Sequence, residues 1–215
     1  MANVFGGAPH ARPCTGRGKP ESLALLEKLV KRVYPLSADD SALPITIEVI
    51  PGAPVNAFAT LGGHIYVFEG LIKQAKSAEE LAGVLAHEIE HVRNRHIIQG
   101  VAVNLFTLGA LKVALPGDQQ TGSQIARVLL TLTFSRQQEY EADEMGLQRL
   151  RAARVDAGGI QQFFARAEKM PSPPQILSNH PANETRARLA EQYRGYPVEP
   201  IMDATEWAIL GAICE

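Results

Sequence analysis

A His-Glu-Ile-Glu-His motif at residues 87–91 limits what this chain can fold into more than any other stretch. An α-helix turns once every 3.6 residues, so His87 and His91 project from one face and can bind the same metal ion. Glu88 stands beside the first histidine, where its carboxylate can act as general base on a water held by the metal. The motif therefore predicts a metal-binding helix.

The residues around the motif support a helix. Apolar side chains recur at helical spacing, at Leu81, Val84, Leu85 and Val92. Acidic residues stand at the start of this segment and basic residues at its end, which suits the helix dipole. Two histidines four residues apart can also be a buried pair without a metal, and the string can arise by chance. Other parts of the chain have to decide between these interpretations.

The composition argues against several classes of function. At 215 residues, with 46% hydrophobic and 20% charged residues, the chain is long enough for one substantial core. A net charge of −2 and an aromatic content of 6% give no basis for binding nucleic acid. The most apolar run, residues 101–115, is interrupted by Asn104 and Lys112 and is too short to span a bilayer comfortably.

The two ends of the chain carry no chemical motif. The first twenty residues are rich in glycine and proline and lack the continuous apolar segment of a signal peptide. Cys14 and Cys214 can form a disulfide in an oxidising compartment or remain two free thiols. Neither cysteine has the neighbour at CxxC spacing that a thiolate zinc site needs.

Apolar periodicity and breaker residues predict the other elements. Helices are expected over residues 21–34, 70–75, 125–150, 160–169, 183–193 and 203–214, and strands over 45–50, 55–59 and 63–68. Residues 96–117 are expected to be helical or a hairpin. The strands should form a small antiparallel or mixed sheet near the metal-binding helix, and an extended peptide could pair with its edge.

A second acidic cluster offers a third metal ligand, because a tetrahedral zinc site that keeps a water needs three protein ligands. Glu139 and Asp143 are four residues apart in the expected helix and share a face, whereas Glu141 is rotated away from them. We assign Glu139 as the third ligand and Asp143 as the partner of a ligand imidazole, whose tautomer it would fix. A solvated acidic helix face is the alternative.

Four separated motifs, in this order, resemble the gluzincin zinc endopeptidases that include the HtpX proteases and the CAAX prenyl proteases. They are Asn56-Ala-Phe-Ala59, the motif at residues 87–91, Glu139-Tyr-Glu-Ala-Asp143 and His180-Pro181. The resemblance extends over roughly residues 44–188. It implies an α+β, mainly helical zincin-like domain with a sheet of about three strands beside the motif helix. It also implies one Zn²⁺ ion per chain.

The resemblance assigns roles around this ion. His87 and His91 match two zinc ligands and Glu88 matches the general base. Glu139 matches the third ligand, in agreement with the argument from helix faces. Membrane members of the family carry spanning helices, and no segment here has adequate length. The chain therefore resembles a soluble branch.

On the substrate side, the resemblance matches His180 to a histidine that stabilises the oxyanion, and Arg186 to an arginine six residues later. An imidazole suits this role because peptide hydrolysis places negative charge on the former carbonyl oxygen. Asn56 resembles a contact to the substrate backbone. We place Ala57 and Phe58 in the same substrate-binding segment.

The remaining histidines have no assigned role, with one exception. His10 and His96 are interpreted as ordinary loop or packing residues. His64 lies close enough to the expected edge strand to touch a substrate.

Together these features predict a zinc-dependent metalloendopeptidase that acts on peptides or unfolded proteins. We expect residues 1–19 to be a flexible lead-in, residues 20–200 a single metallopeptidase domain and residues 201–215 a C-terminal helical tail. The abrupt start is compatible with a membrane-anchored parent. A soluble domain, periplasmic or membrane-associated in a bacterium, is the expected location.

Three alternatives remain open. An aminopeptidase would share the motif, but it needs a recognition device for a free amino terminus, and the chain has no GxMEN-like segment. A chaperone-like or peptide-binding module could retain zinc without turnover. A latent protease could have its cleft covered by residues 101–115 or by the tail after Pro200.

Overall fold

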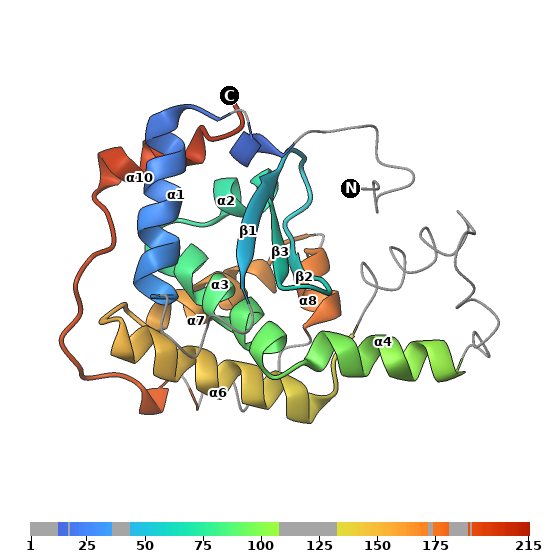
Figure 1. Ribbon diagram of the computed structural model, residues 1–215. Coiled ribbons are helices and arrows are strands. Elements are labelled where there is room, and N and C mark those ends of the chain that lie inside the picture. The colour runs from blue at the N-terminus through green and yellow to red at the C-terminus, as the bar shows by residue number, and fades with distance from the viewer. Residues whose placement is uncertain are drawn as a thin grey trace.

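The molecule is built around one buried helix, α3 (Ala78–Arg93), which carries the histidine motif. A computed structural model describes residues 13–16, 18–35, 44–107, 133–171, 174–180, 189 and 191–215. In Figure 1, α3 lies between a small sheet and two further helices, α6 (Arg136–Ala152) and α7 (Gly158–Ala167). All residues from Ala78 to Val92 except Glu79 are buried.

Local sequence explains why α3 begins where it does and how closely its neighbours approach. The Ser77 side chain caps the helix by accepting a hydrogen bond from the Glu80 N–H. Gly83 faces α7, where a Cβ atom would stand 2.6 Å from the Cβ of Ile160. Gly146 of α6 faces the α3 backbone, where an added Cβ atom would lie 3.4 Å from the carbonyl carbon of Ala86. These small residues bring α6 and α7 close to the motif.

The sheet has three strands in the order β1-β3-β2. Strand β1 (Thr46–Ile50) runs parallel to β3 (His64–Phe68), and β2 (Ala57–Ala59) runs antiparallel to β3. Side chains alternate across the sheet, so Ile65 and Val67 face the core while Tyr66 points to the other face. The expected mixed sheet beside the motif helix is confirmed, and with it the α+β fold class.

The other described elements are the 3-10 helix η1 (Cys14–Gly16) and the helices α1 (Pro20–Val33), α2 (Glu69–Gln74), α4 (His96–Thr107), α8 (Gln175–Asn179) and α10 (Ala204–Gly211). They include three helices that match predicted ones, α1, α2 and α10. None of the helices within the described ranges is long and apolar enough to cross a membrane. Helix α8 was not predicted, because five residues are too few to show a periodic pattern.

One predicted helix is wrong in its extent. The continuous helix expected over residues 125–150 does not include residues 133–135, because α6 starts at Arg136. Ser135 accepts a hydrogen bond from the Gln138 N–H, and the Gln138 side chain accepts one from the Ser135 N–H. This capping box fixes the start of the helix. Residues 108–132 lie outside the described residues, as does most of the helix expected over 183–193.

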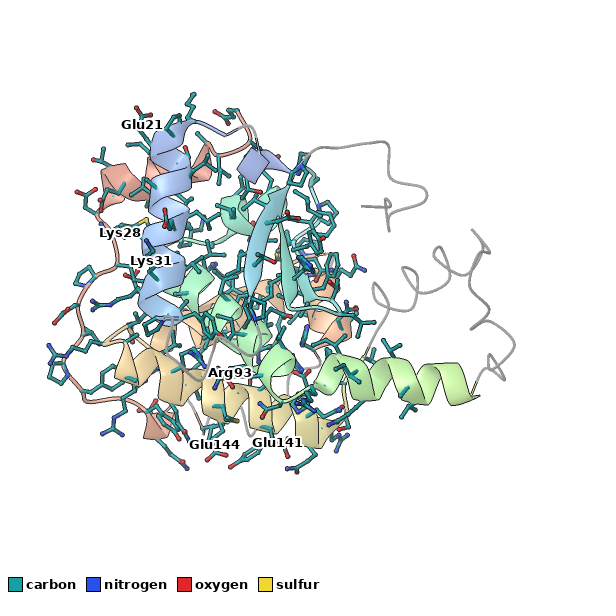
Figure 2. The ribbon with its side chains drawn as sticks, viewed as in Figure 1. Glu21, Lys28, Lys31, Arg93, Glu141 and Glu144 are labelled. Atoms are coloured by element: carbon teal, nitrogen blue, oxygen red, sulfur yellow. A yellow bond between two sulfur atoms is a disulfide. The ribbon has the colours of Figure 1, made fainter. Side chains whose placement is uncertain are left out.

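Helix α1 covers the body with one apolar face and leaves its charged residues outside. Leu26 and Leu29 are buried, whereas the labelled residues Glu21, Lys28 and Lys31 lie on the outside of the molecule (Figure 2). Helix α10 packs against α1, and Lys28 forms an exposed ion pair with Glu206 at 2.7 Å. The final segment of the chain therefore docks on the first helix.

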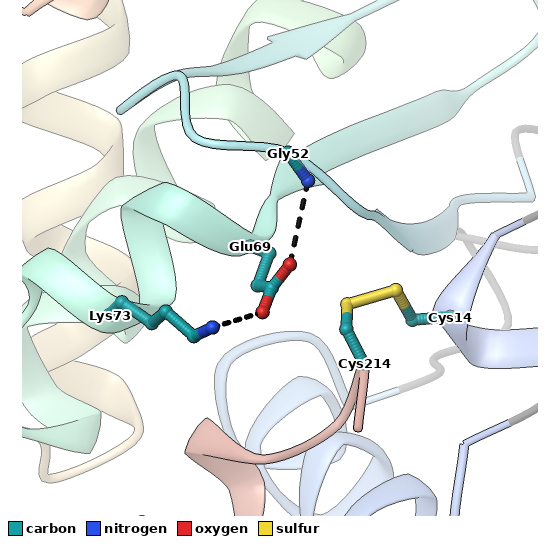
Figure 3. The surroundings of a disulfide bond; sticks show 5 residues. All are labelled: Cys14, Gly52, Glu69, Lys73 and Cys214. Atoms are coloured by element: carbon teal, nitrogen blue, oxygen red, sulfur yellow. Dashed lines mark hydrogen bonds and ion pairs between the residues drawn. A yellow bond between two sulfur atoms is a disulfide. The ribbon is translucent and has the colours of Figure 1, made fainter. Parts of the chain in front are cut away.

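A disulfide between Cys14 and Cys214 joins the two ends of the described chain (Figure 3). The sequence left this pairing open. The two Cα atoms are 4.9 Å apart although 200 residues separate them in the chain. Close by, Glu69 of α2 pairs with Lys73 and accepts a hydrogen bond from the Gly52 N–H (Figure 3). The crosslink thus holds the first and last elements against the body.

Removing this disulfide is expected to lower the free energy of unfolding by about 2–4 kcal/mol, because a crosslink over a long loop restricts the unfolded chain. The variant is Cys14→Ser with Cys214→Ser, and the measurement is denaturant unfolding without reductant. Wild-type protein in reductant should unfold like the variant. Equal midpoints for the variant and the oxidised wild type would contradict the expectation.

Candidate metal centre

Helix α3 presents the two motif histidines to one point. His87 and His91 are buried, and their Nε2 atoms lie 2.9 Å apart. Their ring centroids are 4.6 Å apart with the planes at 71°, so the two lone pairs converge while the rings diverge. This is the arrangement expected of two imidazoles that share an ion.

Helix α6 brings Glu139 to the same point from more than forty residues away. The capped start of α6 places Glu139 in its first turn, fully buried against α3. Glu139 Oε1 lies 3.4 Å from His91 Nε2, and Glu139 Oε2 lies 3.5 Å from His87 Nε2. The two helices named by the sequence therefore meet at this carboxylate.

His180 joins the group as its fourth member. It is the C-cap of α8, and its buried side chain places Nδ1 3.0 Å from Glu139 Oε1 and 3.1 Å from His87 Nε2. The sequence analysis expected His180 beside the substrate, not among the ligand atoms. Helix α8 ends at Asn179, and this termination points the ring inward.

These four residues fit a divalent ion such as zinc. Their ligand atoms lie within 4.8 Å of one another, and the five distances given above between neighbouring atoms run from 2.9 to 3.5 Å. Four tetrahedral ligands at zinc bond lengths would stand roughly 3.3–3.4 Å apart. Imidazole nitrogens with one carboxylate are also a donor set that zinc prefers. Such close packing of buried acceptor atoms is easiest to explain by a cation among them.

A second carboxylate supports the first histidine. Asp143, one turn after Glu139 in α6, is buried with its Oδ1 2.8 Å from His87 Nδ1. When His87 offers Nε2 to an ion, its proton resides on Nδ1 and can be donated to Asp143. Ala142 between the two acids is fully buried, which lets α6 approach α3.

Glu88 lies beside the group without being part of it. Its side chain is buried, and burial raises the pKa of its carboxyl group, whereas His180 and His87 act to lower it. The Ala59 N–H of β2 donates to this carboxylate. His180 Nε2 lies 3.2 Å from Glu88 Oε1, within ion-pair distance but without hydrogen-bond geometry. A raised pKa near a cation suits a carboxylate that exchanges a proton.

The electrostatics of the group favour a charged Glu139 carboxylate beside a neutral His91 imidazole. Burial alone would raise the pKa of Glu139, but His87, His180 and His91 together hold it well below its usual range. Burial lowers the pKa of His91 well below its ordinary value. A deprotonated carboxylate and neutral imidazoles are the forms that bind a metal ion.

Two residues that the sequence analysis did not select also surround the centre. Phe134 stacks on the His91 ring with centroids 3.8 Å apart, and the His96 ring meets it at 71°, with Nδ1 3.1 Å from His91 Nδ1. The spacing of a third histidine five residues after His91 was a visible signal. On a continuous helix this residue would lie about 140° away around the axis, so the spacing alone gave no contact.

The segment expected to bind substrate lies next to Glu88. Asn56 is fully buried, and neither polar atom of its side chain has a hydrogen-bond partner among the described residues. The Asn56 carbonyl accepts from Phe68 on β3, so by alternation the N–H and C=O groups of Ala57 and Ala59 point away from β3. The Phe58 side chain stacks on Tyr66 with centroids 5.5 Å apart.

One predicted site residue, His64, is not brought to the centre by the described structure. His64 is exposed on β3, and its Nδ1 lies 2.7 Å from Thr46 Oγ1 on β1, the strand on the far side from β2. Arg186 lies outside the described residues, as does Pro181. His64 therefore contacts β1 and not the buried group, and the assignment of Arg186 stays a prediction.

Comparison with known proteins identifies similar chains. A family model described as peptidase family M48 matches residues 22–194. A Vibrio cholerae protein with the provisional name beta-barrel assembly-enhancing protease is 34% identical over 179 residues, which are 75% of this chain and 37% of the relative. The mitochondrial metalloendopeptidase OMA1 of Schizosaccharomyces pombe is 30% identical over 177 residues, 78% of this chain and 52% of the relative.

A third relative agrees with these two. The beta-barrel assembly-enhancing protease of Escherichia coli K12 is 28% identical over 166 residues, which are 69% of this chain and 34% of the relative. The chain thus spans between about a third and a half of the length of the curated relatives it matches.

Proposed function

Because the chain belongs to peptidase family M48, we propose that it is a zinc-dependent endopeptidase. The family match bears out the resemblance to gluzincin endopeptidases that the sequence motifs carry. The observation that supports the proposal most directly is the convergence of His87, His91 and Glu139 from two helices. In the proposal these three residues hold the ion, and Asp143 orients His87.

In this proposal Glu88 is the general base. Zinc, when bound, supplies a Lewis acid that polarises the scissile carbonyl and acidifies a water. Glu88 takes the proton of the attacking water and passes it to the leaving amine. The surroundings of Glu88 support this role, since the Ala59 N–H orients its carboxylate and burial raises the pKa of the carboxyl group.

His180 has two roles in the proposal, one before and one after a substrate binds. Its Nδ1 stands where a fourth ligand would, and four protein ligands are typical of a closed zinc site, whereas catalysis needs one open position. We therefore propose a latent form in which His180 closes the site. When a substrate enters, His180 withdraws and donates a hydrogen bond to the developing oxyanion, and Arg186 is proposed to assist it.

The proposed substrate is an extended segment of a peptide or an unfolded protein. Strand β2 is one of the two edge strands of the described sheet, and Ala57 turns its backbone polar groups away from β3. A substrate strand can pair there by main-chain hydrogen bonds. The unpartnered amide of Asn56 would add a contact to the substrate backbone, and Phe58 fixes the strand by stacking within the sheet.

The proposed compartment is oxidising. A disulfide such as Cys14–Cys214 persists in the periplasm and is rare in a reducing cytosol. The names of the relatives refer to beta-barrel assembly and to mitochondria, which accords with a proteolytic role in or near a bacterial envelope. We keep the periplasmic or membrane-associated location as part of the proposal.

Metal removal tests the proposed function. Purified protein is expected to contain about one zinc ion per chain and to cut casein at internal bonds. A chelator should stop the cleavage and added zinc should restore it. Cleavage that continues without metal, or zinc-loaded protein that binds casein without cutting it, would contradict the proposal. Release of single amino acids only would favour an aminopeptidase.

A further inference from the structure

His96 occupies a buried position directly behind one of the candidate zinc ligands. It is 1% exposed, and its Nδ1 lies 3.1 Å from His91 Nδ1. Its other nitrogen, Nε2, lies 3.2 Å from Glu141 Oε2 on α6. His91 directs its opposite nitrogen, Nε2, to Glu139 and His87. A continuous chain of polar contacts therefore runs from Glu141 through His96 to the metal-facing side of His91.

When His91 offers Nε2 to an ion, only one distribution of protons gives every contact from His91 to Glu141 a donor and an acceptor. A neutral imidazole then carries its proton on Nδ1, so His91 donates to His96 Nδ1. His96 must accept there, and its own proton resides on Nε2. That N–H donates to the Glu141 carboxylate. Each contact thereby fixes the tautomer of the next ring.

The backbone between α3 and α4 is shaped to make this contact. Helix α3 ends at Arg93, Arg95 adopts a left-handed conformation with φ of 58°, and α4 starts at His96. Such a conformation costs a residue with a side chain roughly 1–2 kcal/mol. The helical path is interrupted here, and the His96 ring contacts His91. Phe134 covers the face of the His91 ring, so this ring is held at its Nδ1 atom by His96 and over its face by Phe134.

Each motif histidine therefore has a hydrogen-bonding partner behind its ring, and the two partners differ in strength. His87 Nδ1 meets Asp143 directly at 2.8 Å, and that carboxylate is buried. His91 Nδ1 reaches Glu141 only through His96, and the Glu141 side chain is 42% exposed. Gln137 donates to the other Glu141 oxygen at 2.7 Å and orients it. Water screens the charge at Glu141, so the oriented imidazole is the stronger part of this support.

We propose that His96 is a positioning residue that holds His91 in the tautomer and orientation for zinc, and that Glu141 orients His96 in turn. The inference rests on the proposed function only in that His91 binds a metal. Partners behind a ligand histidine raise its basicity and typically account for about 10–100-fold in metal affinity.

Two substitutions at His96 separate the hydrogen bond from the packing. The amide oxygen of Asn stands near the position of Nδ1 and can accept from His91, whereas Gln carries its amide near the position of Nε2 and leaves His91 without an acceptor. The measurement is the zinc dissociation constant of metal-depleted full-length chain, by competition with a chromophoric chelator. His96→Gln should weaken zinc binding about 10–100-fold, and His96→Asn should retain most of the affinity.

The outcomes of this test are distinct. Equal affinity for wild type and both variants would overturn the positioning role, and so would an equal loss in both. Thermal unfolding of the metal-depleted variants checks that each one folds. Because zinc affinity is the readout, a chain that binds zinc and cleaves nothing removes the proposed function and leaves this test intact.

Glu141 is tested against a matched residue on the same helix. Glu141→Gln should weaken zinc binding by only a few-fold, since the side chain is partly exposed, and Glu144→Gln should leave it unchanged. Figure 2 marks both glutamates on α6. Nitrogen NMR of the zinc-loaded wild type should find the His96 proton on Nε2. A proton on Nδ1 of His96, or equal effects of the two glutamate variants, would overturn the assigned direction of the hydrogen bonds.

Discussion

Glu88→Gln is expected to lower the turnover number for casein cleavage by about 10²–10⁴-fold while zinc content stays at the wild-type level. Glutamine has the shape of glutamate and can still accept from the Ala59 N–H, but it accepts no proton from water. The carboxylate is not one of the four residues whose ligand atoms converge, so its loss leaves the donor set complete. The measurements are initial rates on zinc-loaded protein and metal analysis of the same samples.

Glu144→Gln is the control for this prediction. It also replaces a glutamate by glutamine, but on helix α6, where Figure 2 shows Glu144 on the outside of the molecule, and its turnover should equal that of the wild type. Undiminished cleavage by Glu88→Gln would discard the base assignment. Loss of zinc from Glu88→Gln would instead make Glu88 part of the metal site.

Arg149→Met is expected to lower the free energy of unfolding by about 3–5 kcal/mol, because it leaves a buried carboxylate without its cation. Glu90, the residue before the second motif histidine, is 1% exposed, and Arg149 of α6 donates to its Oε1 at 2.7 Å. Arg149 also donates to the Val33 carbonyl at 3.2 Å and lies over the Tyr34 ring. This residue connects the two ligand-bearing helices to the end of α1.

An exposed pair supplies the control for Arg149→Met. Lys28→Met breaks the ion pair with Glu206, whose partners are 47% and 33% exposed, and should cost less than about 1 kcal/mol. Adding Glu90→Met to Arg149→Met should recover most of the loss, since no buried charge then remains. Denaturant unfolding of the four proteins measures these differences. An equal effect for Arg149→Met and Lys28→Met would show that the buried pair does not stabilise the fold.

The parts of the site that sequence predicted are those set by helical geometry. Four-residue spacing places His87 with His91, and the same spacing places Glu139 with Asp143. Each pair was assigned inside one helix, where the periodicity is known in advance. To predict that α3 and α6 meet at the site, it was then enough to decide which acidic residue of α6 faces α3.

The parts that sequence did not predict depend on the ends of helices. His96 reaches His91 only because Arg95 takes a left-handed conformation, which usually marks a glycine or an asparagine. His180 points inward because α8, a five-residue helix, stops just before it. The extent of α6 was overestimated because the Ser135 capping box lies inside an otherwise helical pattern. Single residues determine where a helix ends, and apolar periodicity does not reveal these residues.

The joined ends of the described chain have a consequence for protein engineering. Since the Cα atoms of Cys14 and Cys214 are 4.9 Å apart, the polypeptide enters and leaves the domain at one point. A domain with neighbouring ends can be inserted into a surface loop of a carrier protein without stretching its core. The domain can also be circularly permuted by joining these two ends and opening new ends at Gly195. This glycine is exposed, and an added Cβ atom there would meet no other atom within 4 Å.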